Sequence, residues 1–214
     1  MEIHQFIKVL NNTEIGKGGT NDSYVLVSKK AEKMTEMFDL DNRNPIFINK
    51  KSGQKIDTVH ITIDREFRIN GLGEYYRSNN VNAGDEIIFE KQESEQGTIF
   101  YLNLNVKNNV ILFQKNTLGF NVLNQDRLIS MFINDKYEKM AYFKNVLGEL
   151  KIELNQSRKK RIDSPISTDF YSISFNDEEI GGDLKNNEYI KLITDVSNDY
   201  IESVNTWQEY IFNY

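Results

Sequence analysis

The sequence contains no cysteine, only two prolines and only two histidines among its 214 residues. Without cysteine the chain has no disulfide and no thiolate metal site, a usage typical of a reducing compartment, so we expect a cytoplasmic protein. Two prolines argue against long disordered linkers. No run of 18 apolar residues occurs, and the start lacks the basic and apolar regions of a signal peptide. We therefore expect neither a membrane span nor secretion.

The charge of the chain is unevenly distributed. A net charge of −6 at pH 7 is unfavourable for a protein that binds a polyanion. Residues 1–80 nevertheless carry 12 Lys and Arg against 11 Asp and Glu, whereas residues 163–214 carry 2 against 11. The acidity is therefore concentrated near the end, and a positive surface on the first half is compatible with the total.

Apolar patterning predicts many short strands and a few helices. Hydrophobic residues at 39% and aromatic residues at 12% suffice for a core in one large or two small domains. The expected strands are 3–9, 24–28, 45–49, 58–63, 86–91, 98–106, 110–113, 119–123, 149–154 and 170–175. Helical segments are expected at 29–38, 74–78, 127–132, 137–146 and 198–212, with a connector at 156–161. We thus expect a mainly β protein with short helices, whose first domain spans 1–105 and is followed by an α+β extension, 106–214, of unknown role.

A polar loop, 11–23, separates the first two expected strands. It is longer than hairpin loops of about two to five residues, and long loops in compact domains are often functional. It is not a phosphate-binding loop, because Asn11 stands where that motif needs glycine and no Ser or Thr follows Lys17. Asn, Lys, Glu, Ser and Thr side chains can read base edges in the major groove. The candidate readers are Asn11, Asn12, Thr13, Glu14, Lys17, Thr20, Asn21, Asp22 and Ser23.

A second polar stretch, 64–77, offers further groups of this kind. In an extended strand Glu66 and Arg68 share one side. Arg68 can hold guanine O6 and N7 with two N–H groups, and Glu66 can accept from a cytosine amine or orient Arg68. The alternative is a surface ion pair between the two, which contributes little stability. The candidates from this stretch are Arg65, Glu66, Arg68, Asn70, Tyr76 and Arg77.

Together the two stretches resemble the recognition arms of the DNA-binding pseudobarrel family. This family includes the recognition domains of the restriction enzymes EcoRII and BfiI and plant transcription-factor domains. At Thr20 and Asn21 the sequence departs from the His-Gln pair of the restriction branch, so the resemblance leaves the recognised DNA sequence open. The matching residues of the two arms and of the strand entry behind them are Asn12, Thr13, Gly18, Gly19, Glu66, Arg68, Ile69, Gly73, Gly84 and Asp85.

The resemblance covers about residues 1–105 and implies an open pseudobarrel that grips double-stranded DNA between two arms. It implies sequence-specific reading of the major groove within a restriction-modification system. Domains of this type also precede McrB-like GTPase motors, as in LlaJI, which implies a motor domain in the same polypeptide and a separate nuclease subunit as partners. The alternatives are the effector-DNA domain of an EcoRII-like endonuclease and a protein-interaction module with an acidic tail.

A small metal-dependent nuclease is a further alternative, because two carboxylates near a lysine can hold Mg²⁺. In a chain with 27% charged residues such patterns arise freely by chance, so we expect a binding domain without catalytic residues, metal or cofactor. His4 and His60 are 56 positions apart, which argues against a histidine metal site. The basic run 158–161 is interpreted as solvated, with phosphate contact as the alternative. The two nuclease candidates are Glu149-Leu150-Lys151 after Asp135 and Asp183-Leu184-Lys185 after Asp177.

Overall fold

The computed structural model describes residues 2–17, 23–27, 37–38, 41–64, 66–129, 140–145, 148–159, 162, 167–193, 200–204 and 210–213. Strands make up 54% of the structure and helices 7%, which confirms the prediction of a mainly β protein with short helices. The chain forms two compact units, Met1–Lys107 with Gln208–Tyr214, and Asn108–Trp207. The end of the chain thus belongs to the first unit, whereas the sequence placed it in the extension. Among the described residues no helix has the length and apolarity to cross a membrane.

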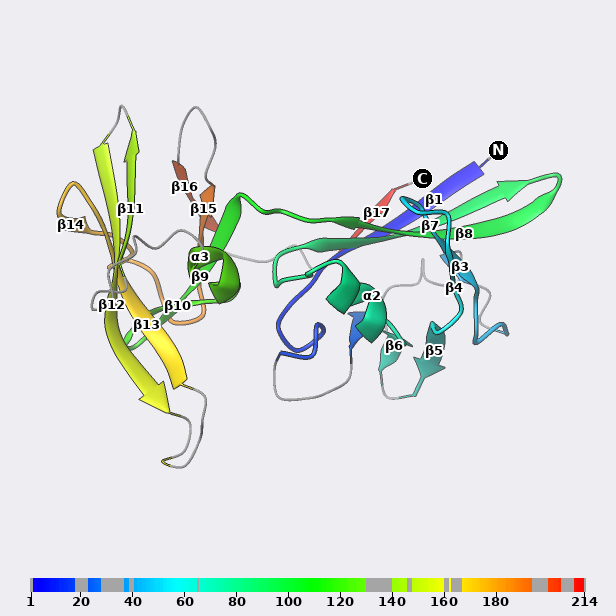
Figure 1. Ribbon diagram of the computed structural model, residues 1–214, viewed down its shortest axis with the longest axis horizontal. Helices are drawn as coiled ribbons and strands as arrows, with labels where there is room; N and C mark the ends of the chain where they lie inside the picture. The colour runs from blue at the N-terminus through cyan, green and yellow to red at the C-terminus, as the bar shows by residue number, and fades with distance from the viewer. Residues whose placement is uncertain are drawn as a thin grey trace. The chain divides into compact units, whose positions relative to one another are not determined.

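The first unit contains a large sheet with the strand order β17-β1-β7-β8-β3-β4 (Figure 1). The pairs β1–β7 and β7–β8 are antiparallel and β3 lies parallel to β8. Strand β17, from the end of the chain, pairs with β1 along Gln5 to Lys8. The bounds are β1 Glu2–Val9, β3 Phe47–Asn49, β4 Lys55–Ile56, β7 Glu86–Ser94, β8 Gly97–Asn105 and β17 Tyr210–Asn213.

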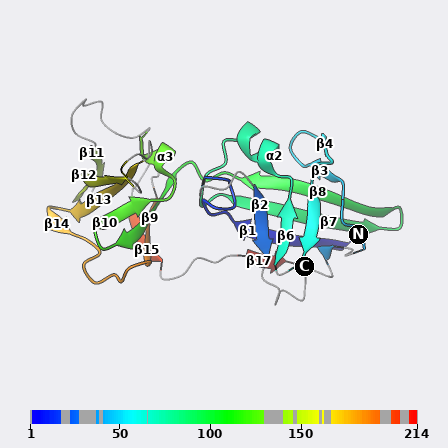
Figure 2. The same cartoon turned by 90° about the horizontal axis from the view of Figure 1, so that it is seen from below.

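A small antiparallel sheet, β2-β6-β5, completes the first unit (Figure 2). It consists of β2 Tyr24–Val27, β5 His60–Ile63 and β6 Phe67–Asn70, and helix α2 Gly73–Ser78 follows β6. Apolar and polar residues alternate along β6, so one face of the sheet packs on the core and the other faces solvent. The buried residues of the inner face are Val25, Val27, Ile61, Phe67 and Ile69.

Phe38 joins the two sheets of the first unit. Its ring centroid lies 6.5 Å from that of Phe67 in the small sheet, and 6.0 and 6.1 Å from those of Phe89 and Phe100 in the large sheet. Aromatic pairs at such distances add attraction beyond the area they bury. Of the predicted helix 29–38, residues 29–36 lie outside the described residues, and Met37 and Phe38 are buried.

The second unit is a separate sheet with the order β11-β12-β13-β10-β9-β15-β16, and β14 pairs with β13. Its core is apolar and includes Phe113, Phe120, Ile152, Tyr171 and Leu192. The bounds are β9 Val110–Asn116, β10 Gly119–Val122, α3 Gln125–Ile129, β11 Met140–Asn145, β12 Gly148–Lys159, β13 Ser167–Phe175, β14 Glu178–Glu179, β15 Tyr189–Ile193 and β16 Tyr200–Val204. Strands predominate, so the expectation of an α+β extension is corrected to mainly β.

Several predicted helices are strands. Residues 140–145 of the expected helix 137–146 form β11, which pairs with β12. The expected terminal helix 198–212 contains β16 and β17, which pair with β15 and β1. Its spacing of three and four fits a helix, but ladders with strands distant in sequence override this local pattern. The predicted connector 156–161 is also wrong in part, because β12 continues to Lys159.

Gly71 makes the turn between β6 and α2 and has no room for a side chain. Its φ is +82°, and a Cβ added there would lie 1.9 Å from the carbonyl oxygen of Thr58. The carbonyl of Gly71 also accepts a hydrogen bond from Thr58 Oγ1 at 2.8 Å. Gly53 has a similar φ of +73° but no atom within 4 Å of such a Cβ. An alanine substitution at Gly53 would therefore introduce backbone strain alone, whereas one at Gly71 would add a steric clash with Thr58.

We predict that Gly71→Ala destabilises the first unit more than Gly53→Ala does. Both variants carry backbone strain of about 1–2 kcal/mol. Only Gly71→Ala adds the overpacking of a new methyl group, about 1–3 kcal/mol. Urea denaturation of the two variants measures the difference in the free energy of unfolding. Equal losses would show that Thr58 and Gly71 are not in close contact.

Candidate nucleic-acid interface

The first loop begins as an ordered turn held by its own side chains. Leu10 exchanges backbone hydrogen bonds with the segment before β7, donating to Asp85 O at 2.9 Å and accepting from Gly84 N at 2.8 Å. Asn11 Oδ1 then accepts from the backbone N–H groups of Thr13 and Glu14, each at 3.0 Å. An Asn side chain that accepts from following amides stabilises a turn. Asn11 therefore shapes the loop, although its side chain is exposed.

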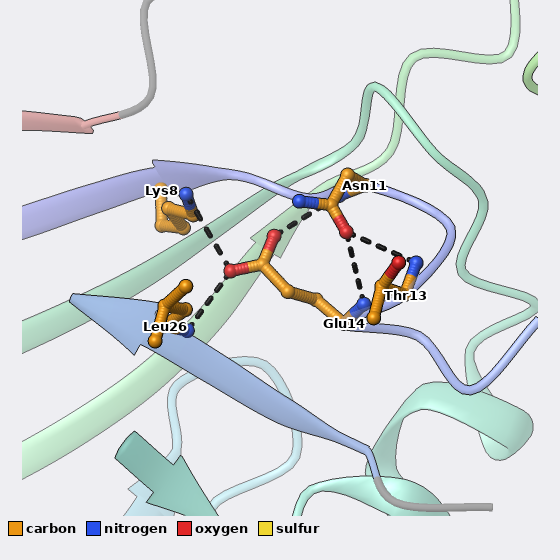
Figure 3. A network of polar contacts seen from close by, with 5 residues as sticks. All are labelled: Lys8, Asn11, Thr13, Glu14 and Leu26. Atoms are coloured by element: carbon orange, nitrogen blue, oxygen red, sulfur yellow. Dashed lines mark hydrogen bonds and ion pairs between the residues drawn. The ribbon is translucent and has the colours of Figure 1, made fainter. Parts of the chain in front are cut away.

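Glu14 lies inside the unit and connects the loop to two strands (Figure 3). Its residue is 1% exposed, and Oε1 accepts from Leu26 N at 2.9 Å and lies 3.4 Å from Lys8 Nζ. Its other oxygen, Oε2, accepts from Asn11 N at 3.1 Å. A carboxylate engaged in this way cannot reach a base edge. We therefore correct the prediction that Glu14 reads DNA and assign it a role in holding the loop.

Burial raises the pKa of Glu14, because removal from water disfavours its charged form. The positive charge of Lys8 and the hydrogen bonds from Leu26 and Asn11 oppose this shift without cancelling it. Lys8 is itself only 4% exposed. The pair is thus a buried ion pair, whose disruption by removal of one partner is costly.

Tyr76 is a second candidate that the structure places in the interior. It is 3% exposed, and its hydroxyl has no hydrogen-bond partner among the residues that the structure describes. Burial raises the pKa of Tyr76 well above its usual value, and the negative charge of Glu14 acts in the same direction. The neighbouring Tyr75 donates to the carbonyl of Leu102 in β8 at 3.4 Å. Tyr76 therefore belongs to the packing of α2, and we remove it from the candidate interface.

The outer face of the small sheet carries the exposed polar groups. We define this outer face by the outward residues of its three strands. Strand register places Arg68 between Leu26 and Thr62, and Asn70 between Tyr24 and His60. Alternation puts these residues opposite the buried apolar row. The residues of the outer face are Tyr24, Leu26, His60, Thr62, Arg68 and Asn70.

Arg68 is held in a defined orientation on the outer face. Its Nε and Nη2 donate to Glu66 Oε2 at 2.8 and 2.5 Å, and its Cζ lies 4.7 Å from the centroid of the Tyr24 ring. Stacking of a guanidinium on an aromatic face adds an electrostatic attraction. Asn70 is oriented similarly, since its Nδ2 donates to Thr62 Oγ1 at 2.5 Å. The side chains of Arg68 and Glu66 remain 41% and 46% exposed.

A pocket of about 510 Å³ opens beside this arginine, lined by Thr62, Asp64, Glu66 and Arg68. Two carboxylates next to one guanidinium disfavour phosphate but complement base edges, which present amino donors beside carbonyl or ring-nitrogen acceptors. Thr62 and Asp64 are not among the site residues predicted from the sequence. The alternating pattern of 58–63 indicated that Thr62 and His60 face outward, so they could have been included. Arg65, another sequence candidate, lies outside the described residues.

The end of the first loop and the start of α2 meet at one end of the small sheet. A Cβ built on Gly73 would lie 3.4 Å from Ser23 Oγ and 3.2 Å from Arg77 Nη1. Lys17 is exposed, and its Nζ donates to Asn82 Oδ1 at 2.9 Å. The structure thus brings Ser23 and Arg77, one candidate from each stretch, to the same place. Asn12 is half-buried and Thr13 exposed in the turn, whereas Gly18, Gly19, Thr20, Asn21 and Asp22 lie outside the described residues.

The two nuclease candidates lie in the second unit, and the structure describes the first of them only in part. Asp135 lies outside them, and Lys151 pairs with Glu153 at 2.8 Å. Asp177 and Asp183 are exposed. In the described part of the chain, one group of three side chains could hold a metal ion, and it lies in the first unit: Glu2, His4 and Glu93. Arg158 and Lys159 are exposed at the end of β12.

No protein-family model and no curated protein matches this sequence. Support for a function therefore comes from the geometry of the outer face and from the sequence pattern of the two arms. The structure supports Arg68 and Glu66 as exposed, oriented groups and Asn70 as a half-buried, oriented one. Ser23 and Arg77 lie close to each other at Gly73, and Lys17 is exposed and donates to Asn82. Glu14 and Tyr76 are part of the scaffold.

We predict that Glu14→Gln destabilises the protein by about 1–3 kcal/mol, because one buried backbone N–H would then face an amide NH₂ group instead of an acceptor. Glu66→Gln is the matched control, since it removes the same charge from an exposed pair and should cost at most about 1 kcal/mol. Urea denaturation at neutral pH compares the two. A larger loss for Glu66→Gln would contradict the buried position of Glu14.

A comparison of wild type with Glu14→Gln tests the raised pKa of Glu14. The carboxyl group of Glu14 keeps its proton to a higher pH in the folded state than in the unfolded chain. The contribution of Glu14 to stability therefore falls as the pH rises above 4.5, the ordinary pKa of a glutamate. Gln has no such proton. The difference in free energy of unfolding between wild type and Glu14→Gln should therefore be larger at acidic pH near 4.5 than at alkaline pH, as measured by urea denaturation at each pH. A difference that grows with pH would show a lowered pKa.

Proposed function

We propose that the first unit is a pseudobarrel-type domain that binds double-stranded DNA and reads base edges in the major groove with the outer face and the loops at its end. The observation that carries the proposal is the orientation of Arg68, whose side chain is 41% exposed, by Glu66 and by the buried ring of Tyr24. An arginine whose fork is already oriented loses less conformational entropy when it binds. Arg paired with guanine O6 and N7 is the commonest specific contact between protein and DNA.

The spacing of the polar residues on β6 matches the spacing of base pairs. Residues two apart on a strand are separated by about 6.6 Å and point to the same side. Successive base pairs are about 3.4 Å apart along the duplex. Arg68 and Asn70 can therefore address base pairs about two steps apart, Arg68 reading guanine and Asn70 reading adenine.

The neighbouring cations supply contacts of a different kind. Lys17 and Arg77 are exposed, and the Ser23 hydroxyl lies near the guanidinium of Arg77 across Gly73. Lys, Arg and Ser side chains commonly hold phosphates, which fix the register of a protein on DNA without specifying sequence. In this proposal Asp64 and Glu66 keep phosphate away from the pocket and accept hydrogen bonds from base amino groups.

Membership of a restriction system is supported by the sequence resemblance of the two arms. In that setting the unit targets a motor in the same polypeptide, and a separate nuclease subunit cleaves the DNA. We accordingly propose that this chain binds DNA without cutting it. Incubation of a supercoiled plasmid with the chain and Mg²⁺ tests this, and nicking abolished by Glu149→Ala or Asp183→Ala would assign cleavage to the second unit.

We predict that Arg68→Ala weakens binding to the preferred duplex by about 1–3 kcal/mol and relaxes preference at one or two base pairs. Arg68→Lys keeps the charge but lacks the planar fork, so it should lose the same preference while binding unrelated duplexes as wild type does. Selection from a random duplex pool, followed by affinity measurement at fixed salt concentration, gives both quantities.

Lys55→Ala is the control for these variants, because Lys55 is exposed on β4 of the large sheet and is not among the residues of the outer face. It should leave the selected sequence unchanged. Circular dichroism establishes that each variant is folded. If Arg68→Ala and Arg68→Lys both select the wild-type sequence, the outer face does not read bases and the proposal is wrong.

A further inference from the structure

The start of β1 and the end of β7 bring one histidine and two glutamates together on one face of the large sheet. His4 Nε2 lies 3.1 Å from Glu2 Oε1 and 3.5 Å from Glu93 Oε2. One ligand atom from each residue lies within 4.8 Å of the other two. The side chain of His4 is 12% exposed, whereas those of Glu2 and Glu93 are 71% and 38% exposed, so the group is open to solvent on the glutamate side.

We propose that Glu2, His4 and Glu93 bind a divalent first-row transition-metal ion, with Zn²⁺ as the representative ion. The spacing of the group agrees with such a site. Zinc lies about 2.0–2.2 Å from nitrogen and oxygen ligands, so two ligands of a tetrahedral site are about 3.3–3.5 Å apart. The separations of 3.1 and 3.5 Å around His4 Nε2 are close to that value.

Strand register supplies a second, independent argument. Glu2 and Glu93 are direct partners across the β1–β7 ladder, and His4 is the partner of Lys91. Like charges directly opposite each other destabilise a sheet. Lys91 Nζ lies 2.9 Å from Glu93 Oε1, so this lysine offsets part of the repulsion. A divalent cation bridging the two glutamates would replace their mutual repulsion by attraction to the ion, which Lys91 alone achieves only for Glu93.

The donor set selects the class of ion. Mg²⁺ and Ca²⁺ prefer sites made of oxygen ligands alone. An imidazole nitrogen with carboxylate oxygens suits zinc and its first-row neighbours. Three protein ligands with solvent in the fourth position is an ordinary arrangement for zinc. The bound ion would fasten the first residues of β1 to β7, at the end of the β1–β7 ladder and apart from the proposed DNA-binding face on the small sheet.

The composition of the chain makes the test decisive. With no cysteine and only two histidines, a zinc site with an imidazole or thiolate ligand must use His4 or His60. His60 is exposed on β5 and is not part of the group. Isothermal titration with ZnCl₂ of the tag-free chain, after treatment with a chelator, compares wild type, His4→Ala, His60→Ala and Glu93→Gln. Thermal unfolding with and without zinc follows the same four proteins.

We expect wild type and His60→Ala to bind one equivalent of zinc and to unfold at a higher temperature in its presence. His4→Ala and Glu93→Gln should each bind about tenfold more weakly or worse, since even loss of an outer-shell partner of a metal commonly costs that much. Circular dichroism checks that the variants fold. If His4→Ala does not fold, Glu93→Gln alone decides the test. Absence of zinc binding by wild type, or equal binding by Glu93→Gln, would overturn the proposal.

Discussion

The buried carboxylate of Glu14 links three parts of the first unit that are separate in the sequence. It accepts hydrogen bonds from Asn11 at the start of the first loop and from Leu26 in β2, and it forms an ion pair with Lys8 in β1. A charged group in the interior is tolerated only when its hydrogen-bonding capacity is used in this way. This one side chain therefore fastens the described start of the loop, 11–17, to β1 and β2. Ser23, next to Gly73 and Arg77, directly precedes β2.

The small sheet combines stability and proposed function in one alternating pattern. Val25, Ile61 and Ile69 face the aromatic core around Phe38, so the sheet is anchored by apolar burial. The intervening positions place Arg68 and Asn70 on the outer face, each oriented by a neighbour within the same sheet. A binding group carried on a strand is positioned more accurately than one on a loop. This arrangement is why we assign base reading to the sheet and phosphate contacts to the loop and to α2.

Features that depend on local pattern could be predicted from the sequence, whereas features that depend on distant partners could not. Strands β1, β2, β3, β5, β7 and β8 were predicted from the apolar pattern, whereas β4, β6 and β17 were not. The pairing of Arg68 with Glu66 was one of the two alternatives that the sequence left open. Burial of Glu14 could not be predicted, because a polar residue in a polar loop gives no sign of its partners Lys8 and Leu26. The terminal segment was predicted as a helix because its spacing suits one. Its partners are strands β1 and β15, which no local pattern reveals.

The central claim is that the outer face of the small sheet contacts DNA. Backbone NMR chemical shifts of the ¹⁵N-labelled chain, recorded with and without a selected duplex, test it most directly. The account predicts that the largest shifts fall in 11–17, in β2, and in β5 and β6 with the turn between them, while β9 to β15 of the second unit change little. Shifts confined to the second unit, or none in β6, would contradict it.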